Sequence, residues 1–213
     1  DCTSCINYTA CGNISTCDVA GCNYLTTGCY VSTRCVTSCC NCASYRKTTF
    51  VNITNNITIA AWINMTSWVD YGSILEFGTV SGEQYSLNSQ NITRGTGLTA
   101  NGLSFGSNWP GTWYLTYPTG TLANATGTWI YVCVSFASGT TTWYINGTLN
   151  TTVSQGINSL TSVSGGYVGV GDNFPGGQEY FNGLISIIKV YNRVLSSAEI
   201  AKNFKAHRGR YGV

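Results

Sequence analysis

The sequence predicts an all-β fold, a two-sheet antiparallel sandwich or jelly roll with one short C-terminal helix, preceded by a small disulfide-rich segment. Ten of the eleven cysteines fall within the first 42 residues. From residue 48 onward, short runs of alternating β-branched and aromatic residues recur between glycines and asparagines. The composition changes near residue 45. We therefore expect a cysteine-rich unit over residues 1–46 and a β-sandwich over residues 47–213.

The N-terminal unit has few large apolar residues, so cross-links have to hold it together. Ten thiols at this density are typical of a disulfide framework made in an oxidising compartment. A zinc site, suggested by the C-x-x-C spacing at Cys2, is the alternative, but it would use four thiolates and leave six unexplained. The predicted disulfide cysteines are Cys2, Cys5, Cys11, Cys17, Cys22, Cys29, Cys35, Cys39, Cys40 and Cys42.

The residue pattern of the second unit predicts a series of short strands. Antiparallel pairing would arrange these strands in two packed sheets. The pair Asn146-Gly147 predicts a type I′ hairpin turn. Ser196 and Glu199 form a capping-box pattern, followed by apolar residues at helical spacing. Strands are expected over 48–53, 57–65, 72–79, 83–89, 98–105, 112–117, 128–137, 140–146, 148–153, 166–171 and 180–191.

Composition narrows the functional classes. Charged residues make up 8% of the chain and the net charge is +2, which gives little attraction for nucleic-acid phosphates. The longest apolar run, residues 129–137, is too short to span a bilayer. No signal peptide begins the sequence, so we interpret it as a processed chain.

N-glycosylation sequons support a secreted protein at an extracellular, cell or virion surface. We expect several of them to carry sugar, with Asn146 at its hairpin tip among the most accessible. The nine asparagines are Asn7, Asn13, Asn52, Asn56, Asn64, Asn91, Asn124, Asn146 and Asn150.

Five blocks resemble the laminin-G-like jelly roll, a branch of the concanavalin A-like lectin/glucanase fold. They are 57–63, 129–136, 143–147, 181–185 and 190–200. The resemblance spans about residues 48–213 and implies a jelly roll whose relatives bind glycans, adhere, hydrolyse or build structures. The six-residue cysteine period is weakly similar to disulfide-stapled β-solenoids of insect antifreeze proteins, without their ice-binding repeat.

Catalytic patterns are missing, and we predict that the chain is not an enzyme. Glucanases of this superfamily carry paired carboxylates on one strand. Here Glu76 and Glu83 lie in different elements, and no two carboxylates lie within four residues of each other. The G-x-S-x-G pattern at Ser104 lacks the strand-to-helix context of a nucleophile elbow, although Asp172 and His207 follow it in hydrolase order.

Three further features are candidate sites. The resemblance implies calcium at Asp70 and Asp172 as a candidate site. The alternative is that both carboxylates only cap turns. No cofactor is otherwise required. Cys133 is either a buried free thiol or the partner of an N-terminal cysteine. Aromatic residues in a turn-rich stretch could contact a glycan or a protein partner, or pack internally: Trp109, Trp113, Tyr114 and Tyr117.

We therefore predict a non-enzymatic structural glycoprotein subunit of an extracellular or virion-surface filament or appendage. Its N-terminal cysteine-rich arm would make the inter-subunit contacts, and the low surface charge would favour self-association. The alternative is a secreted, lectin-like carbohydrate-binding module. Neither role involves nucleic acid or a membrane span.

Overall fold

The computed structural model describes residues 29–31, 44–47, 53–79, 82–91, 102–109, 112–120, 122, 125–163, 167–172 and 179–213. Apart from the backbone of Cys29, the predicted disulfide cysteines lie outside these residues, as do Asn7, Asn13, Asn52 and Asn124. Within the described residues, no helix is long and apolar enough to cross a membrane.

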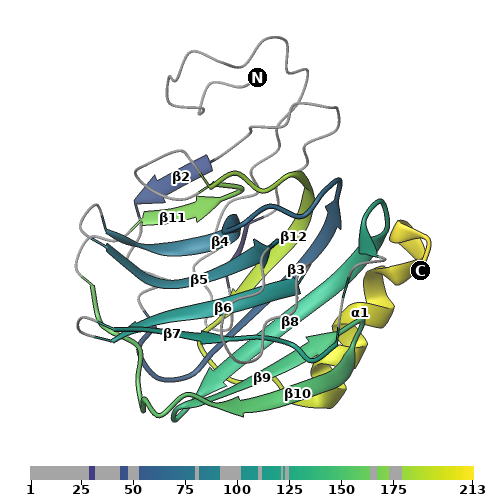
Figure 1. The fold of residues 1–213 in the computed structure, drawn as a ribbon. Helices are drawn as coiled ribbons and strands as arrows, with labels where there is room; N and C mark the ends of the chain where they lie inside the picture. The colour runs from purple at the N-terminus through teal and green to yellow at the C-terminus, as the bar shows by residue number, and fades with distance from the viewer. Residues whose placement is uncertain are drawn as a thin grey trace.

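The strands of the described residues form two antiparallel six-stranded sheets, and Figure 1 shows them as two layers. Sheet A has the order β1-β12-β3-β8-β9-β10, and sheet B has the order β2-β11-β4-β5-β6-β7. The strands of sheet A are β1 (Cys29–Val31), β3 (Ile57–Met65), β8 (Trp129–Ala137), β9 (Thr140–Ile145), β10 (Thr148–Ser154) and β12 (Gly183–Tyr191). Those of sheet B are β2 (Ser44–Lys47), β4 (Gly72–Thr79), β5 (Gly82–Gln90), β6 (Gly102–Trp109), β7 (Thr112–Thr116) and β11 (Tyr167–Val170).

The main hydrophobic core lies between the sheets because alternate residues of each strand point inward. Ile59 and Val132 supply it from sheet A, and Phe77, Leu87 and Phe105 from sheet B. Each of these five side chains is fully buried. The sandwich fold predicted from the alternating pattern is confirmed.

Most predicted strands are present with ends shifted by a few residues. Of the strand expected over 48–53, only residue 53 lies in the described part, and it is not in a strand. The adjacent strand is β2, which ends at Lys47. β12 begins at Gly183 rather than at residue 180, after an isolated bridge between Ser73 and Tyr180.

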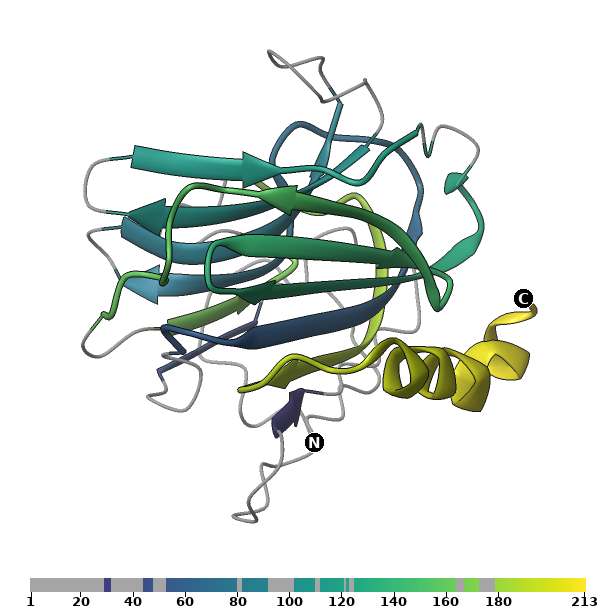
Figure 2. The same cartoon turned by 90° about the horizontal axis from the view of Figure 1, so that it is seen from below.

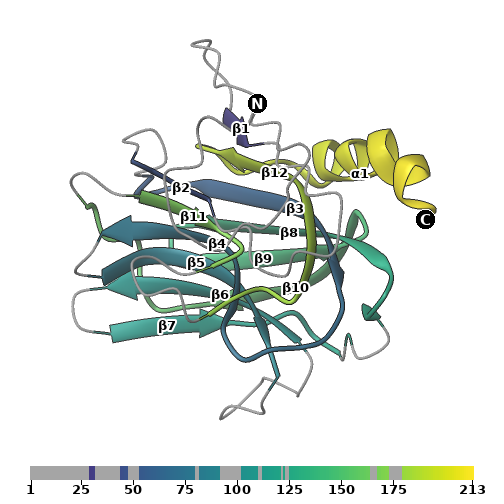
Figure 3. The same ribbon diagram turned by 90° about the horizontal axis from the view of Figure 1, so that it is seen from above.

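Helix α1 (Ser197–Tyr211) covers the outer face of sheet A, and Figures 2 and 3 show it outside the two layers, directly after β12. Trp62, Tyr131 and Cys133 lie on this face and form a second apolar cluster with Ile200 of the helix. Phe204 packs against the same cluster. The helix thus buries the part of this face around Trp62 and Tyr131, which the sandwich core does not use.

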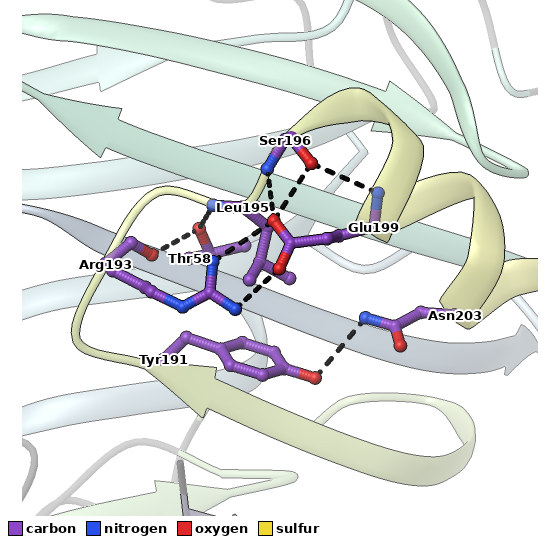
Figure 4. A network of polar contacts seen from close by, with 7 residues as sticks. All are labelled: Thr58, Tyr191, Arg193, Leu195, Ser196, Glu199 and Asn203. Carbon is purple, nitrogen blue, oxygen red and sulfur yellow. Dashed lines mark hydrogen bonds and ion pairs between the residues drawn. The ribbon is translucent and has the colours of Figure 1, made fainter. Parts of the chain in front are cut away.

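The start of α1 is held by the predicted capping box. The Ser196 side chain accepts a hydrogen bond from the Glu199 backbone N–H, and the Glu199 carboxylate accepts one from the Ser196 N–H. The Thr58 hydroxyl on β3 donates to the Arg193 carbonyl at 2.8 Å and accepts from the Leu195 N–H at 3.1 Å (Figure 4). These bonds fix the connection between sheet A and the helix.

The predicted hairpin turn at Asn146 and Gly147 is confirmed. Both residues have positive φ angles, 50° and 76°, as a type I′ turn requires. At Gly147 a side chain would also meet Phe204 of the helix, since an added Cβ would lie 2.9 Å from the Phe204 Cβ. Glycine is therefore needed here for both the turn and the docking of α1.

Two strands from the N-terminal part of the chain lie at the sheet edges. β1 pairs with β12 at the edge of sheet A, and β2 pairs with β11 at the edge of sheet B. The N-terminal region thus contributes backbone to both sheets. The boundary between residues 46 and 47 remains a prediction.

Candidate functional site

A row of polar side chains lies on the face of sheet B that is turned away from the core. Along β5, Tyr85 and Leu87 point into the core, so Ser86, Asn88 and Gln90 point the other way. The Asn88 amide nitrogen donates to the Ser86 hydroxyl at 3.0 Å, and the Gln90 amide nitrogen donates to the Ser104 hydroxyl at 2.8 Å. We call this surface the polar face.

Every one of these side chains is buried; Gln90 and Ser104 are 0% exposed and Asn88 is 5% exposed. Among the described residues, the oxygens Asn88 Oδ1 and Gln90 Oε1 have no hydrogen-bond partner. Because buried amides are normally paired, these acceptors indicate unused binding capacity on the polar face.

Three carboxylates meet at one end of the polar face. Glu76 comes from β4, Glu83 from β5, and Glu179 from the segment that precedes β12. One carboxylate oxygen of each lies within 4.8 Å of the other two. Glu76 is buried, with 2% of its surface exposed, whereas Glu83 and Glu179 are half-buried.

The surroundings of Glu83 favour its neutral form. Burial raises the pKa of Glu83 from 4.5 to about 7, with a further rise from the Glu179 charge, opposed by a hydrogen bond from Ser86. A carboxyl with this pKa exchanges a proton near neutral pH. The carboxylate cluster can therefore hold either a shared proton or a cation.

Sequence reasoning missed this cluster. Glu76 and Glu83 lie on different elements and share no sequence motif, but antiparallel pairing of β4 with β5 places Glu76 opposite Ser86 and Gly78 opposite Glu83. Glu179 is held by the hydrogen bond from the Ser73 N–H to its carbonyl, 2.8 Å long. The hairpin between β4 and β5 was the one available signal, since it brings the first two residues together.

The predicted calcium ligands lie elsewhere. Asp172 follows β11 and is buried, and Asp70 is half-buried in the turn before β4. Neither belongs to the cluster of Glu76, Glu83 and Glu179. Among the described residues, that cluster is the one group of three or more side chains close enough to share a metal ion. Calcium at Asp70 and Asp172 remains a prediction.

The aromatic candidates belong to a hairpin rather than to a loop. Trp109 ends β6 and Trp113 lies in β7, with their side chains outside the described part. Tyr114 packs against the core, which is the internal role among those predicted for these residues. Tyr117 is half-buried just after β7.

The sequon asparagines that the structure describes differ in environment. Asn56 and Asn91 are exposed, whereas Asn64, Asn146 and Asn150 are half-buried. The Asn146 side chain accepts a hydrogen bond from the Tyr131 N–H at 2.9 Å, which turns it toward β8. Asn146 is therefore less accessible than its hairpin-tip position predicted.

The residues of the hydrolase-like pattern are not brought together. Ser104 is buried within β6 of sheet B. His207 lies on α1, which packs on sheet A, and its Nδ1 is 2.9 Å from the Asn203 carbonyl oxygen. Cys133 is a free, fully buried thiol among the described residues, and burial raises its pKa well above the usual range.

A family comparison agrees with this architecture. Residues 41–201 match the family described as the concanavalin A-like lectin/glucanases superfamily, in its laminin-G group. The chain belongs to this family. The resemblance drawn from the five sequence blocks is thus confirmed, while no curated protein matches the chain.

Solved structures with the same fold include carbohydrate-bound modules. Domain 4 of an extracellular arabinanase from Geobacillus stearothermophilus, in complex with arabinotriose, is 14% identical, with 82% of this chain and 86% of that chain covered and a TM-score of 0.56. The carbohydrate-binding module of a Ruminococcus gnavus sialidase, bound to sialyllactose, is 22% identical, with 72% and 84% covered and a TM-score of 0.57. A heptameric pentraxin from Limulus polyphemus is 18% identical, with 75% and 79% covered and a TM-score of 0.55. At these identities the similarity shows the fold alone.

Proposed function

We propose that this family member is an extracellular, non-catalytic carbohydrate-binding module, carried on a secreted and disulfide-bonded glycoprotein. The family and the sugar-bound structures of the same fold support this role. The observation in the chain itself that carries it is the polar face, with its amide oxygens at Asn88 and Gln90.

Amide and hydroxyl groups suit a sugar ligand because each sugar hydroxyl can donate and accept a hydrogen bond. Asn88 and Gln90 each present an acceptor, and Ser86 and Ser104 hold their amide nitrogens in place. Since these groups are buried, a glycan can bind them only when the polar face becomes accessible. Binding is therefore expected to involve a structural change.

A glycan array tests this proposal with the full chain. We expect binding to at least one glycan class, and loss of roughly tenfold or more in affinity for Asn88→Ala and Gln90→Ala, since each removes a polar contact worth about 1.4 kcal/mol or more. Ser154→Ala, an exposed change on β10, is the matched control and should bind as the unmodified chain does. Absence of any array signal from the unmodified chain contradicts the proposal.

A second role, a structural subunit of a filament or appendage, is favoured by the placement of β1 and β2. Both strands come from the N-terminal part of the chain and pair at a sheet edge. If β1 or β2 of one subunit paired with a sheet edge of the next subunit, the same backbone hydrogen bonds would join the two sandwiches. In this role the N-terminal arm is the connector.

Negative-stain imaging and size-exclusion chromatography separate the two roles. A structural subunit assembles as the full chain, and removal of residues 1–45 abolishes that assembly. A chain lacking only residues 1–28 retains both edge strands and serves as the comparison. A full-length protein that stays monomeric contradicts the structural role.

A further inference from the structure

We propose that Asn64 carries an N-linked sugar whose first ring packs against Trp129 and Leu184 on the outer face of sheet A. Asn64 is the first residue of a sequon that Thr66 completes, and Thr66 is exposed. This modification site rests on the glycoprotein part of the proposed function, because N-linked sugars are attached to secreted chains. It does not depend on sugar binding at the polar face, which belongs to the other sheet.

Strand register places Asn64 between two apolar side chains. Its neighbours along β3, Ile63 and Met65, lie in the core, so Asn64 points to the outer face. Asn64 pairs directly with Trp129 of β8 on one side and with Leu184 of β12 on the other. Directly paired residues point to the same face, with their Cβ atoms about 4.5–5.5 Å apart. A sugar on the Asn64 amide nitrogen therefore stands within reach of both side chains.

Helix α1 covers the next row of residues on this face. In that row Trp62 pairs with Ser186 on β12 and with Tyr131 on β8. Tyr211, the last residue of α1, stacks on Trp62 and donates a hydrogen bond to the Ser186 hydroxyl at 2.8 Å. Gly212 follows in the left-handed conformation, with a φ of 72°, and ends the helix. Tyr211 thus stands at the border between this row and the row of Asn64.

The row of Asn64 keeps apolar surface open to solvent. Trp129 is half-buried, and its ring meets the Tyr211 ring with 4.7 Å between the centroids. Leu184 is 38% exposed and is one of the exposed large apolar side chains among the described residues. N-acetylglucosamine, the first sugar of an N-linked glycan, carries apolar C–H groups that can pack on an aromatic ring. A sugar on Asn64 would therefore bury apolar surface that the described part of the chain leaves open.

The hydrogen bonding of the Asn64 amide is compatible with a sugar. Its Nδ2 donates to the Gly127 carbonyl at 3.4 Å, in an exposed bond that is longer than the usual range of about 2.7–3.2 Å. Asn150, by contrast, makes three hydrogen bonds with Thr119, two of them through Oδ1. A glycosylated amide keeps one N–H, so the sugar displaces at most the one long bond to Gly127.

Glycopeptide mapping of the full chain, secreted from a eukaryotic host, tests the attachment. We expect sugar on Asn64 as well as on the exposed Asn56. Sugar on Asn56 with none on Asn64 would overturn the Asn64 site alone. If every sequon is unmodified, the Asn64 site fails together with the glycoprotein part of the proposed function.

Melting temperatures test the packing. Thr66→Ala removes the sequon but keeps Asn64, and Thr66→Ser is the matched control that keeps the sequon. With the glycans trimmed to one N-acetylglucosamine, the unmodified chain should melt roughly 2–4 °C above Thr66→Ala, the shift expected for one aromatic contact in a chain of this size. When Trp129→Leu removes the aromatic ring beside Asn64, the effect of Thr66→Ala should fall to less than half, and Trp129→Phe should restore it.

Proton NMR of the trimmed glycoprotein gives a readout that does not depend on stability. The ring protons of the Asn64 sugar, identified by their loss in Thr66→Ala, should be shifted upfield of those on Asn56, because they lie over the Trp129 ring. The proposal is overturned if the two sugars have equal shifts. It is also overturned if Thr66→Ala melts with the unmodified chain, or if Trp129→Leu keeps the full difference.

Discussion

The ring of Tyr211, in the last turn of α1, stacks on Trp62 of β3 with 4.2 Å between the ring centroids and 24° between the planes. Phe204, two turns earlier, stacks on the same indole at 5.6 Å and 20°. Trp62 is fully buried under these rings. Trp62 is therefore the ring on sheet A that both aromatic residues of the helix contact, beside the contacts of Phe204 with Tyr131 and of Tyr211 with Trp129.

Phe204→Ala should lower the free energy of unfolding by about 2–4 kcal/mol, because it removes a large aromatic contact and leaves a cavity over Trp62. Lys205→Ala, an exposed change on the next residue, should stay within about 0.5 kcal/mol. Urea unfolding followed by tryptophan fluorescence measures both. Equal stabilities would show that the helix contributes nothing to the fold.

Glu199 makes the helix start sensitive to acid. The Arg193 guanidinium donates two hydrogen bonds to it, at 3.1 and 2.7 Å, and these bonds, with those from Ser196, lower its pKa from 4.5 to about 2 (Figure 4). A lowered pKa in the folded state gives stability that is present above pH 4.5 and is lost as the pH falls toward 2. Glu199→Gln should therefore be less stable than the unmodified chain at pH 6, with the difference vanishing near pH 2 in thermal melts.

Local patterns gave the strands and the helix correctly because their causes are local. Alternation along β3 and β8 follows from the two-residue period of a strand, and the Ser196–Glu199 pair acts within one helical turn. The helix docking on Trp62 was not predicted, since nothing near Trp62 in the sequence shows that Phe204 and Tyr211 of the distant helix stack on it. The carboxylate cluster was missed for the same reason: it depends on strand register and on Glu179, which lies far along the chain from Glu83.

Glu83 should make the stability depend on pH in the opposite sense to Glu199. Its folded pKa of about 7 lies above the ordinary value of 4.5, so the folded state binds the proton more tightly. Stability should therefore fall as the pH rises from about 4.5 to 7 and then level off. The Glu83→Gln chain should lack this part of the profile, and calorimetry of both proteins from pH 4 to 8 measures it. Parallel profiles would contradict the assignment.

Cys133 should be unreactive in the native protein. Its side chain is fully buried on the helix-covered face of sheet A, and burial raises the pKa of the thiol, so little thiolate is available. We expect iodoacetamide to label Cys133 only in denaturant, as peptide mapping would show. Labelling under native conditions at the rate of an exposed thiol would mean that α1 does not stay docked.

Asn150 should remain unglycosylated although it lies in a sequon. Its Oδ1 accepts hydrogen bonds from the Thr119 N–H at 2.6 Å and the Thr119 hydroxyl at 3.2 Å, while its Nδ2 donates to the Thr119 carbonyl at 3.2 Å. N-glycosylation would turn the Asn150 side chain into a secondary amide, which adopts the trans form. The sugar would then stand on the same side of the amide as Oδ1, in place of the Nδ2 hydrogen that bonds to the Thr119 carbonyl. The attachment of Thr119 to β10 and a glycan on Asn150 therefore exclude each other.

Glycopeptide mapping of the chain secreted from a eukaryotic host measures this. Asn56 and Asn91, both exposed, should carry sugar, and the Asn150 peptide should be unmodified. Asn150→Ala should cost about 1 kcal/mol or more of stability through the lost hydrogen bonds. Thr152→Ala removes the same sequon but keeps the amide. It loses only the exposed hydrogen bond from the Thr152 hydroxyl to the Thr142 hydroxyl, 3.4 Å long, so its stability should stay within about 0.5 kcal/mol of the unmodified chain and its glycan mass should match. A glycan found on Asn150 would contradict the prediction, because the bonds to Thr119 could not then be formed as they are in this structure.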